Sequence, residues 1–234
     1  MHSPLPETQT RTHNNRTPVL EFKNVSFTWP GGIGLHNVSF SIPEGQFVLI
    51  SGSSGSGKST LLRLIVRLEE ASKGEILLHG TPITTFYPPS LRTHIGFVQQ
   101  QPILIPGSVR QNLLFPFALH SRKNCTQPEE KILIHWLQRL ALGNISLETP
   151  AETLSIGQQQ RVCFIRAVLT NPDIICFDEP TSSLDRESRE CVEYAAEELV
   201  QQGTSVVMVN HTSYHPTCPH MHLSVADGTV SVLT

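Results

Sequence analysis

The sequence lacks any long apolar run. Its longest apolar stretches, such as Phe47–Ile50, have the length of a β-strand, whereas a membrane-spanning helix needs roughly 18 or more consecutive apolar residues. Residues 1–18 are polar, rich in Pro, Thr and Asn, and without the apolar core of a secretory signal. We therefore expect a disordered tail over 1–18 and, if the protein serves a membrane, a separate chain that does the spanning.

An excess of positive charge is also missing. The 234 residues contain 17 Lys and Arg against 20 Asp and Glu, and the basic residues are scattered. No nucleic-acid partner is expected, because binding a phosphate backbone needs a concentrated basic surface. The 5 cysteines form no CxxC pair, and an odd number cannot close completely into intramolecular disulfides. These absences favour a protein of the reducing cytosol.

What is present is a set of short strands and helices in a chain that is 38% hydrophobic, enough for one sizeable core. Val19–Phe27 and Leu35–Ile42 alternate roughly between apolar and polar residues, which predicts two antiparallel strands joined by the turn Pro30-Gly31-Gly32. A strand over Gln46–Ser51 and a helix over Ser59–Glu69 follow, the opening of a parallel α/β sheet. The apolar face predicted for that helix consists of Leu61, Leu62, Ile65 and Leu68.

The middle of the chain has a different character from its two ends. Prolines punctuate it, and its patterning predicts a helical subdomain over about residues 101–153, with helices at Ser108–Leu114 and Pro128–Leu142. The sheet is completed on either side of this subdomain. We expect strands at Glu75–His79, His94–Val98, Ile174–Phe177 and Ser205–Val209, helices at Gly157–Leu169 and Arg186–Gln201, and a hairpin over Met221–Leu233 that turns at Asp227-Gly228.

A glycine-rich loop lies between the strand Gln46–Ser51 and the helix after it. Its residues, Gly52-Ser53-Ser54-Gly55-Ser56-Gly57-Lys58-Ser59, fit the phosphate-loop pattern G-x-x-x-x-G-K-[ST] in the structural context that supports it. Glycines let backbone N–H groups curl around phosphate oxygens, Lys58 reaches the β and γ phosphates, and Ser59 binds Mg²⁺. The loop therefore predicts a site that holds the phosphates of a ligand together with Mg²⁺. A glycine-serine turn without chemistry is the alternative.

Two carboxylates end the strand Ile174–Phe177. Asp178 and Glu179 are therefore expected at the C-terminal edge of the sheet, where α/β proteins bind ligands. Asp178 would hold Mg²⁺ through water, and Glu179 would orient or deprotonate an attacking water. Such a pair also fits a solvated turn or a helix cap, and the phosphate loop is what favours the catalytic interpretation.

A third motif lies between these two. Leu154-Ser155-Ile156-Gly157-Gln158-Gln159-Gln160-Arg161 is similar to the LSGGQ signature of the ABC (ATP-binding cassette) ATPases, and the chain resembles that family from about Leu20 to the C-terminus. Ser183-Leu184-Asp185 is similar to the family's D-loop, Gln100 to its Q-loop glutamine and His211 to its switch histidine. The order and spacing of these pieces match the family pattern.

The resemblance implies the fold and the domain organisation. Residues 19–234 would form one ABC ATPase domain: an α/β P-loop NTPase core with a mainly parallel sheet, an N-terminal antiparallel β subdomain and a helical subdomain that carries the signature motif. In the family, two such domains face head to tail with ATP between them. The implied partners are a second ABC ATPase subunit, identical or different, and a membrane permease. The permease would dock in a groove near Gln100 and the helical subdomain, which places the chain peripherally at the cytoplasmic face of the cell membrane.

The resemblance also implies the site residues. Glu179, His211, Lys58 and Gln100 are the implied catalytic residues, and Trp29 stands where the family usually has a Tyr that stacks on adenine, a role the larger indole should keep. The implied nucleotide-binding residues are Trp29, Gly52, Ser53, Ser54, Gly55, Ser56, Gly57, Lys58, Ser59, Thr60, Ser155, Gly157 and Gln158. The implied Mg²⁺ residues are Ser59, Gln100 and Asp178.

One signature position departs from the family. Ile156 stands where Gly is usual, and a β-branched residue adopts a positive φ only at a cost. If the site needs that conformation, ATP turnover would be slowed; if it uses an ordinary helical φ, little changes. We expect retained activity, because Gly157, Glu179 and His211 are intact.

Other functions remain open from the sequence. ATP-driven transport through a separate permease is the expected function, and the run 109–116 looks like that of small prokaryotic cassettes, among them the iron-export ATPases. A soluble ABC ATPase of the cofactor-assembly type is the alternative, whereas a P-loop kinase would leave the signature motif unexplained. A metal site is suggested by a C-terminal cluster, although its irregular spacing favours a solvated loop. That cluster is His211, His215, Cys218, His220 and His222.

Overall fold

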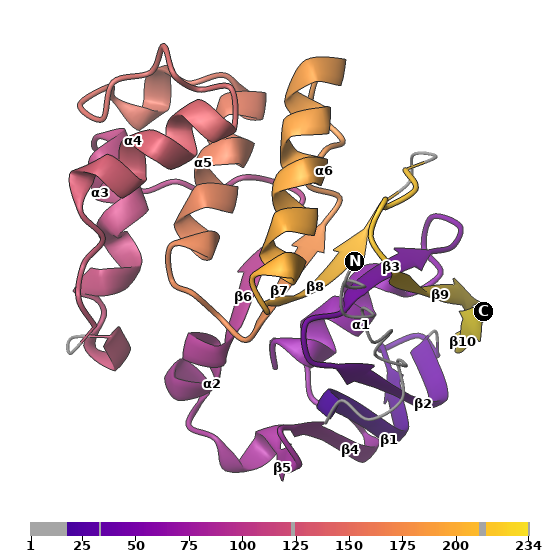
Figure 1. Ribbon diagram of the computed structural model, residues 1–234. Coiled ribbons are helices and arrows are strands. Elements are labelled where there is room, and N and C mark those ends of the chain that lie inside the picture. The colour runs from indigo at the N-terminus through magenta and orange to yellow at the C-terminus, as the bar shows by residue number, and fades with distance from the viewer. Residues whose placement is uncertain (1–17, 33, 123–124, 211–213, 234) are drawn as a thin grey trace, which may run out of the picture.

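The structure, a computed structural model, describes residues 18–32, 34–122, 125–210 and 214–233 (Figure 1). The tail predicted over 1–18, apart from its last residue, and the predicted switch histidine His211 lie outside these ranges. Within them, no helix combines the length and the apolar character needed to span a bilayer.

A six-stranded sheet in the order β10-β9-β3-β8-β7-β6 forms the centre of the molecule. The strands are β3 (Phe47–Ser51), β6 (Ile95–Val98), β7 (Ile174–Asp178), β8 (Ser205–Val209), β9 (His220–Ala226) and β10 (Thr229–Leu233). Neighbouring strands are parallel except for the terminal hairpin β9–β10, which turns at the expected Asp227-Gly228. The mainly parallel sheet predicted from the sequence is confirmed.

Both faces of this sheet are covered, so its central strands read as continuous apolar runs in the sequence. Along β3, Val48 and Ile50 belong to one buried cluster, while Phe47 and Leu49 belong to the other. Strands β7 and β8 alternate in the same way between the two clusters. The first cluster includes helix α1 (Lys58–Ile65), and the second includes the helices on the opposite face.

A second, four-stranded antiparallel sheet closes the first cluster. Its order is β2-β1-β4-β5, and its strands are β1 (Pro18–Thr28), β2 (Gly34–Pro43), β4 (Lys73–Leu78) and β5 (Thr81–Pro82). The predicted antiparallel pairing of the first two strands is confirmed, with Leu20 opposite Ile42 and Phe22 opposite Phe40. Helix α1 lies between this sheet and the central one, which fixes the loop in front of α1 between two rigid layers (Figure 1).

Helices cover the other face of the central sheet (Figure 1). They are α3 (Val109–Leu114), α4 (Glu130–Arg139), α5 (Ile156–Val168) and α6 (Arg186–Gln201). Short 3₁₀ turns lie at Phe115–Ala118 (η2), His120–Arg122 (η3) and Ala151–Thr153 (η4), and a further one, Ile83–Thr85 (η1), follows β5 and contributes Ile83 to the first cluster. Helix α6 and strand β8 have the predicted bounds.

Two local expectations were wrong. Helix α1 ends at Ile65 and not near Glu69, because Arg67 adopts a left-handed backbone with φ of 51° and its guanidinium donates to the carbonyls of Ile83 and Phe86. Leu68, expected on the buried face, is 47% exposed as a result. Helix α2 (Pro88–His94) was not expected at all, although proline is well tolerated in the first turn of a helix.

Candidate functional site

The glycine-rich loop leaves the C-terminal end of β3 and runs into α1. Gly52, Gly55 and Gly57 all have a positive φ, of 150°, 77° and 110°. A Cβ on Gly52 would also overlap the carbonyl of Val225 on β9, so this position demands glycine on both counts. The loop is therefore built to present backbone to a ligand at close range.

Lys58 opens helix α1 and folds back over the loop. Its side chain is 5% exposed, and Nζ donates to the carbonyl oxygens of Gly52 at 3.0 Å and Ser53 at 2.8 Å. The ammonium group thus lies beside the inner surface of the loop. This places a positive charge where an anionic ligand held by the loop would sit.

The next residues of α1 tie the loop to two other elements. The Ser59 hydroxyl donates to Oδ1 of Asp178 at 3.1 Å, which brings the loop to the end of β7. The Thr60 hydroxyl accepts a hydrogen bond from Trp29 Nε1 at 3.2 Å, which fixes the indole beside the loop. Trp29 also packs edge to face against Phe27, with ring centroids 4.9 Å apart.

The two carboxylates at the end of β7 have different surroundings. Asp178 is 6% exposed; burial raises the pKa of its carboxyl, the hydrogen bond from Ser59 opposes the rise and the charge of Glu179 adds to it. Glu179 is only partly buried and has a left-handed backbone with φ of 51°, a conformation that costs a non-glycine residue on the order of 1 kcal/mol. Its Oε2 accepts a hydrogen bond from Gln100 Nε2 at 2.9 Å.

Most of these groups line one cleft with a volume of about 500 Å³, and the buried Asp178 is connected to it through its hydrogen bond from Ser59. The residues around it are Trp29, Gly34, Ser54, Gly55, Ser56, Gly57, Lys58, Ser59, Thr60, Arg63, Gln100 and Glu179. Arg63 was not predicted from the sequence; it lies one turn after Ser59 on α1, and its charge acts on the pKa of Asp178. That helical spacing after the phosphate loop is the signal that could have found it.

The signature residues form the start of helix α5 and do not line this cleft. Ser155 caps the helix in a reciprocal pair with Gln158: the Gln158 N–H donates to Ser155 Oγ at 3.3 Å, and the Ser155 N–H donates to Gln158 Oε1 at 2.9 Å. A Cβ on Gly157 would lie 3.1 Å from a Leu184 methyl and 3.2 Å from the Ser183 carbonyl. The signature and the D-loop are thus packed against each other at one surface.

Ile156 is the first residue of α5, and its backbone is helical, not left-handed. Of the two alternatives open from the sequence, the structure has the one that costs no strain. The side chain is 62% exposed. A glycine is therefore not required at this position by the fold of the single chain.

Of the predicted C-terminal cluster, His211 lies outside the described residues, and the contacts of His220, His222 and Cys218 lead to different partners. His222 pairs with the Ser51 hydroxyl at 2.7 Å, His220 bonds to the carbonyl of Cys218, and the Cys218 N–H donates to Glu197 on α6. Within the described ranges, no group of three or more His, Cys, Asp or Glu side chains is arranged to hold a metal ion.

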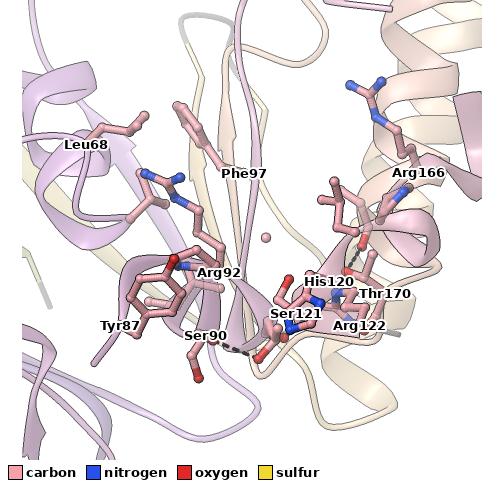
Figure 2. A pocket seen from close by; sticks show the side chains of 18 of the residues that line it. Leu68, Tyr87, Ser90, Arg92, Phe97, His120, Ser121, Arg122, Arg166 and Thr170 are labelled. Carbon is pink, nitrogen blue, oxygen red and sulfur yellow. Dashed lines mark hydrogen bonds between the residues drawn. The ribbon is translucent and has the colours of Figure 1, made fainter. Parts of the chain in front are cut away.

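A larger cavity of about 850 Å³ lies away from the phosphate loop, and we call it the groove. It is bounded by the segment after α1, by α2 and β6, and by η3 and α5; Figure 2 shows Leu68, Tyr87 and Arg92 on one side and His120, Arg122 and Arg166 on the other. Its wall is mostly apolar, without the buried carboxylates and loop backbone of the smaller cleft. The chemistry therefore belongs to the smaller cleft.

Comparison with known proteins gives a consistent result. Residues 35–182 match the family model described as ABC transporter. The chain is 33% identical over 196 residues to the probable iron export ATP-binding protein FetA of Escherichia coli (strain K12), covering 83% of this chain and 85% of that protein. It is 38% identical over 196 residues to the glutamine transport ATP-binding protein GlnQ of the same strain, covering 82% and 81%.

Solved structures agree with these relatives. The dimeric post-hydrolysis structure of the ATP-binding cassette MJ0796, bound to ADP and Pi, superposes with a TM-score of 0.79 at 32% identity, covering 92% of this chain and 98% of that one. CbiO1 from Clostridium perfringens, part of the ABC transporter complex CbiONQ, gives 0.77 at 25% identity, covering 92% and 88%. The chain therefore belongs to the ABC transporter family, as one of its ATP-binding and ATP-hydrolysing domains.

Proposed function

We propose that the cleft hydrolyses ATP in a Mg²⁺-dependent reaction and that a separate membrane permease uses the energy for transport. The observation that carries this proposal is the convergence of three elements: Lys58 over the phosphate loop, the Ser59–Asp178 pair and the Gln100–Glu179 pair. A phosphate-binding loop, a cation site and a candidate base in one cleft are the parts that phosphoryl transfer to water requires.

The nucleotide is assigned to the loop and the aromatic wall beside it. The loop N–H groups and Lys58 would hold the phosphates, while Trp29, fixed by its bond to Thr60, would offer a π face to adenine. The backbone of the loop already has the positive φ at Gly52, Gly55 and Gly57 that such a phosphate-binding turn uses, and glycine adopts it at little cost.

The donor set fits Mg²⁺. Ser59 Oγ and Asp178 Oδ1 lie 3.1 Å apart, Gln100 lies at the same cleft, and all offer the oxygen ligands that this hard cation prefers. When bound, Mg²⁺ neutralises charge on the β and γ phosphates. Asp178 has a further role of its own, since its hydrogen bond to Ser59 keeps the start of α1 against the end of β7.

Glu179 is the proposed base. Its carboxylate would accept a proton from a water molecule as the water oxygen bonds to the γ phosphorus and the bond to the bridging oxygen of ADP breaks. The N–H of Gln100, 2.9 Å from Glu179 Oε2, holds that carboxylate in the cleft. His211 stays a proposed contact to the γ phosphate.

A second cassette would complete the site. Ser155, Gly157 and Gln158 lie at an exposed helix start outside the cleft of their own chain, so they are proposed to face the nucleotide of a partner subunit. The two cassettes of such a dimer are either identical or different, and the dependence of the hydrolysis rate on protein concentration distinguishes these two cases. The transport relatives do not favour the cofactor-assembly alternative.

The groove is the proposed docking site of the permease, which places the chain peripherally at the cytoplasmic face of the membrane. Its lining combines apolar side chains with Arg92, Arg122 and Arg166. An apolar helical segment with an acidic residue complements such a wall in shape and charge. The two relatives are named as a probable iron export protein and a glutamine transport protein, so we assign the choice of cargo to the permease.

The proposal is tested by Mg²⁺-dependent ATPase activity of the purified chain over a range of protein concentrations. Glu179→Gln should lower kcat by at least about hundredfold, the usual contribution of a positioned base, and should still dimerise on ATP. Glu75→Gln, the same change at an exposed position of β4, is the matched control. A wild-type chain that binds ATP but neither hydrolyses it nor dimerises would rule out a self-sufficient pair of identical cassettes.

A further inference from the structure

The segment that carries Gln100 is tied to the signature helix by a row of side chains. On α5, Gln160 Nε2 donates to the carbonyl of Gln99 at 3.0 Å. Six residues further along the same side, Arg166 Nη2 donates to the carbonyl of Ile103 at 2.7 Å, and the Cys163 thiol lies 3.6 Å from that oxygen. Positions 160, 163 and 166 share one side of a helix, so one face of α5 holds the backbone on both sides of Gln100.

At its buried position on α5, the Gln160 side chain lowers the stability of the fold unless its amide group has a specific role. It is 3% exposed, and its Oε1 has no hydrogen-bond partner among the described residues. A buried acceptor without a donor lowers stability. An apolar side chain of equal length would avoid that penalty, so the amide N–H is retained for its bond to Gln99.

The same face of α5 connects three functional regions. Its N-terminus is the signature, with Ser155 as the cap. Arg166 is part of the groove wall (Figure 2), and Cys163 and Gln99 also line the groove. The residue held by these ties, Gln100, reaches Glu179 in the cleft at 2.9 Å.

We propose that Gln160 is a positioning residue that fixes the Q-loop segment, which contains Gln100, to the signature helix α5. This attachment holds the Gln100 side chain where it can donate its hydrogen bond to Glu179. Arg166, which holds Ile103, three residues from Gln100, is the second tie of the same link. The inference rests on the proposed function of the cleft and adds to it a physical connection.

A double-mutant cycle on the purified full chain tests the link. Gln160→Met keeps side-chain length and removes the N–H, and it should lower kcat about fivefold, within the range of one neutral hydrogen bond, while KM for ATP stays within about twofold. In a Gln100→Ala background the same substitution should have no further effect, because the group it positions is gone. Gln138→Met, at an exposed glutamine of α4, is the matched control.

The outcomes separate the two proposals. A Gln160→Met variant with wild-type kcat, or one whose loss multiplies with that of Gln100→Ala, overturns the link, as does a Gln100→Ala variant with full activity. A wild-type chain that binds no ATP and shows no Mg²⁺-dependent hydrolysis overturns the proposed function, and the link with it. If Gln160→Met melts below the assay temperature by circular dichroism, Arg166→Met decides: a loss of about twofold that disappears in the Gln100→Ala background supports the link, and an additive loss or none overturns it.

Discussion

The pKa values of two buried carboxylates in this molecule, those of Asp178 and Glu197, are shifted in opposite directions. Asp178, at the end of β7, accepts a hydrogen bond from the Ser59 hydroxyl, and burial raises its pKa. Glu197, on α6, is 4% exposed and accepts hydrogen bonds from Tyr214, from the backbone and side chain of Thr217 and from the backbone of Cys218. Burial alone would raise the pKa of Glu197, but these donors outweigh it and hold the pKa below its usual value.

The difference separates a group kept for a ligand from a group kept for the fold. The carboxylate of Glu197 is satisfied by the protein, so it stabilises the folded chain by fixing the segment 214–218 to α6. The carboxylate of Asp178 is left in a poorer environment, where its ionised form is disfavoured until something positive is nearby. Substitutions at the two sites should therefore separate activity from stability.

The largest effect is expected from Asp178→Asn. Mg²⁺-dependent ATP hydrolysis should fall by at least about hundredfold, because the negatively charged group that would bind Mg²⁺ is lost, while the hydrogen bond from Ser59 can persist. Steady-state kinetics against Mg²⁺ concentration measure this loss.

Stability of the same variant should change in the opposite direction. The pKa of Asp178 is raised in the folded chain, so its stabilising contribution is complete only below the unfolded value of 3.8 and is lost as pH rises through the folded pKa. At pH 7 without nucleotide, Asp178→Asn should raise Tm by a few degrees, since about 1 kcal/mol corresponds to roughly 2–4 °C in a chain of this size. A lower Tm of Asp178→Asn at pH 7 would mean that the Asp178 carboxylate stabilises the fold, as that of Glu197 does.

Glu197→Gln should give the reverse pattern. The free energy of unfolding should fall by about 2–3 kcal/mol, because the amide group would direct its own N–H groups at donors that now face a carboxylate. Urea unfolding measures the loss, and kcat per folded molecule should stay within about threefold. Tyr214→Phe removes one donor only and should cost about 1 kcal/mol.

The pH dependence of this second carboxylate also differs in sign. Because the pKa of Glu197 is lowered on folding, its contribution is present above the unfolded value of 4.5 and is lost as pH falls through the folded pKa. The difference in unfolding free energy between wild type and Glu197→Gln should therefore shrink as pH drops below about 4.5. A difference that stayed constant down to pH 3 would contradict this account.

Sequence reasoning found the parts of the cleft that form local motifs and missed the parts that do not. The phosphate loop, the carboxylates after β7 and the bounds of α6 follow from short patterns, since periodicity and glycine spacing act within a few residues. Glu197 was missed because its donors lie 17 to 21 residues away, and its one local signal is a charged side chain between the buried residues Ala196 and Leu199.

The groove illustrates the same limit. It is made by α2, β6, η3 and α5, which no local pattern brings together. Helix α2, which forms one wall, was not predicted because two prolines begin it. On another wall, Leu68 is exposed because α1 ends earlier than expected. A groove near Gln100 was expected only from the family resemblance.

A smaller effect is expected at the groove. Arg92→Glu reverses a charge on its wall and should lower recovery of the chain with sedimented membranes of the producing cells about threefold to tenfold, because an acidic permease segment would be repelled. The ATPase rate of the purified chain should stay within about twofold, since Arg92 does not line the cleft. Lys73→Glu, at an exposed position of β4, controls for net charge. Equal membrane recovery of all three proteins would remove the groove from the docking proposal.

The smallest effect is expected at the signature position that departs from its family. Ile156 opens helix α5 with a helical backbone, so Ile156→Gly relieves no strain and changes only an exposed side chain. Glycine is a poorer helix former by about 1 kcal/mol, but the first helical position retains little of that cost because the Ser155 cap holds the turn. Hydrolysis by a dimer of identical chains should therefore change by less than about threefold. A rise of tenfold or more in kcat would mean that the isoleucine obstructs the opposing nucleotide, and would favour a working pair in which a different cassette supplies the other signature.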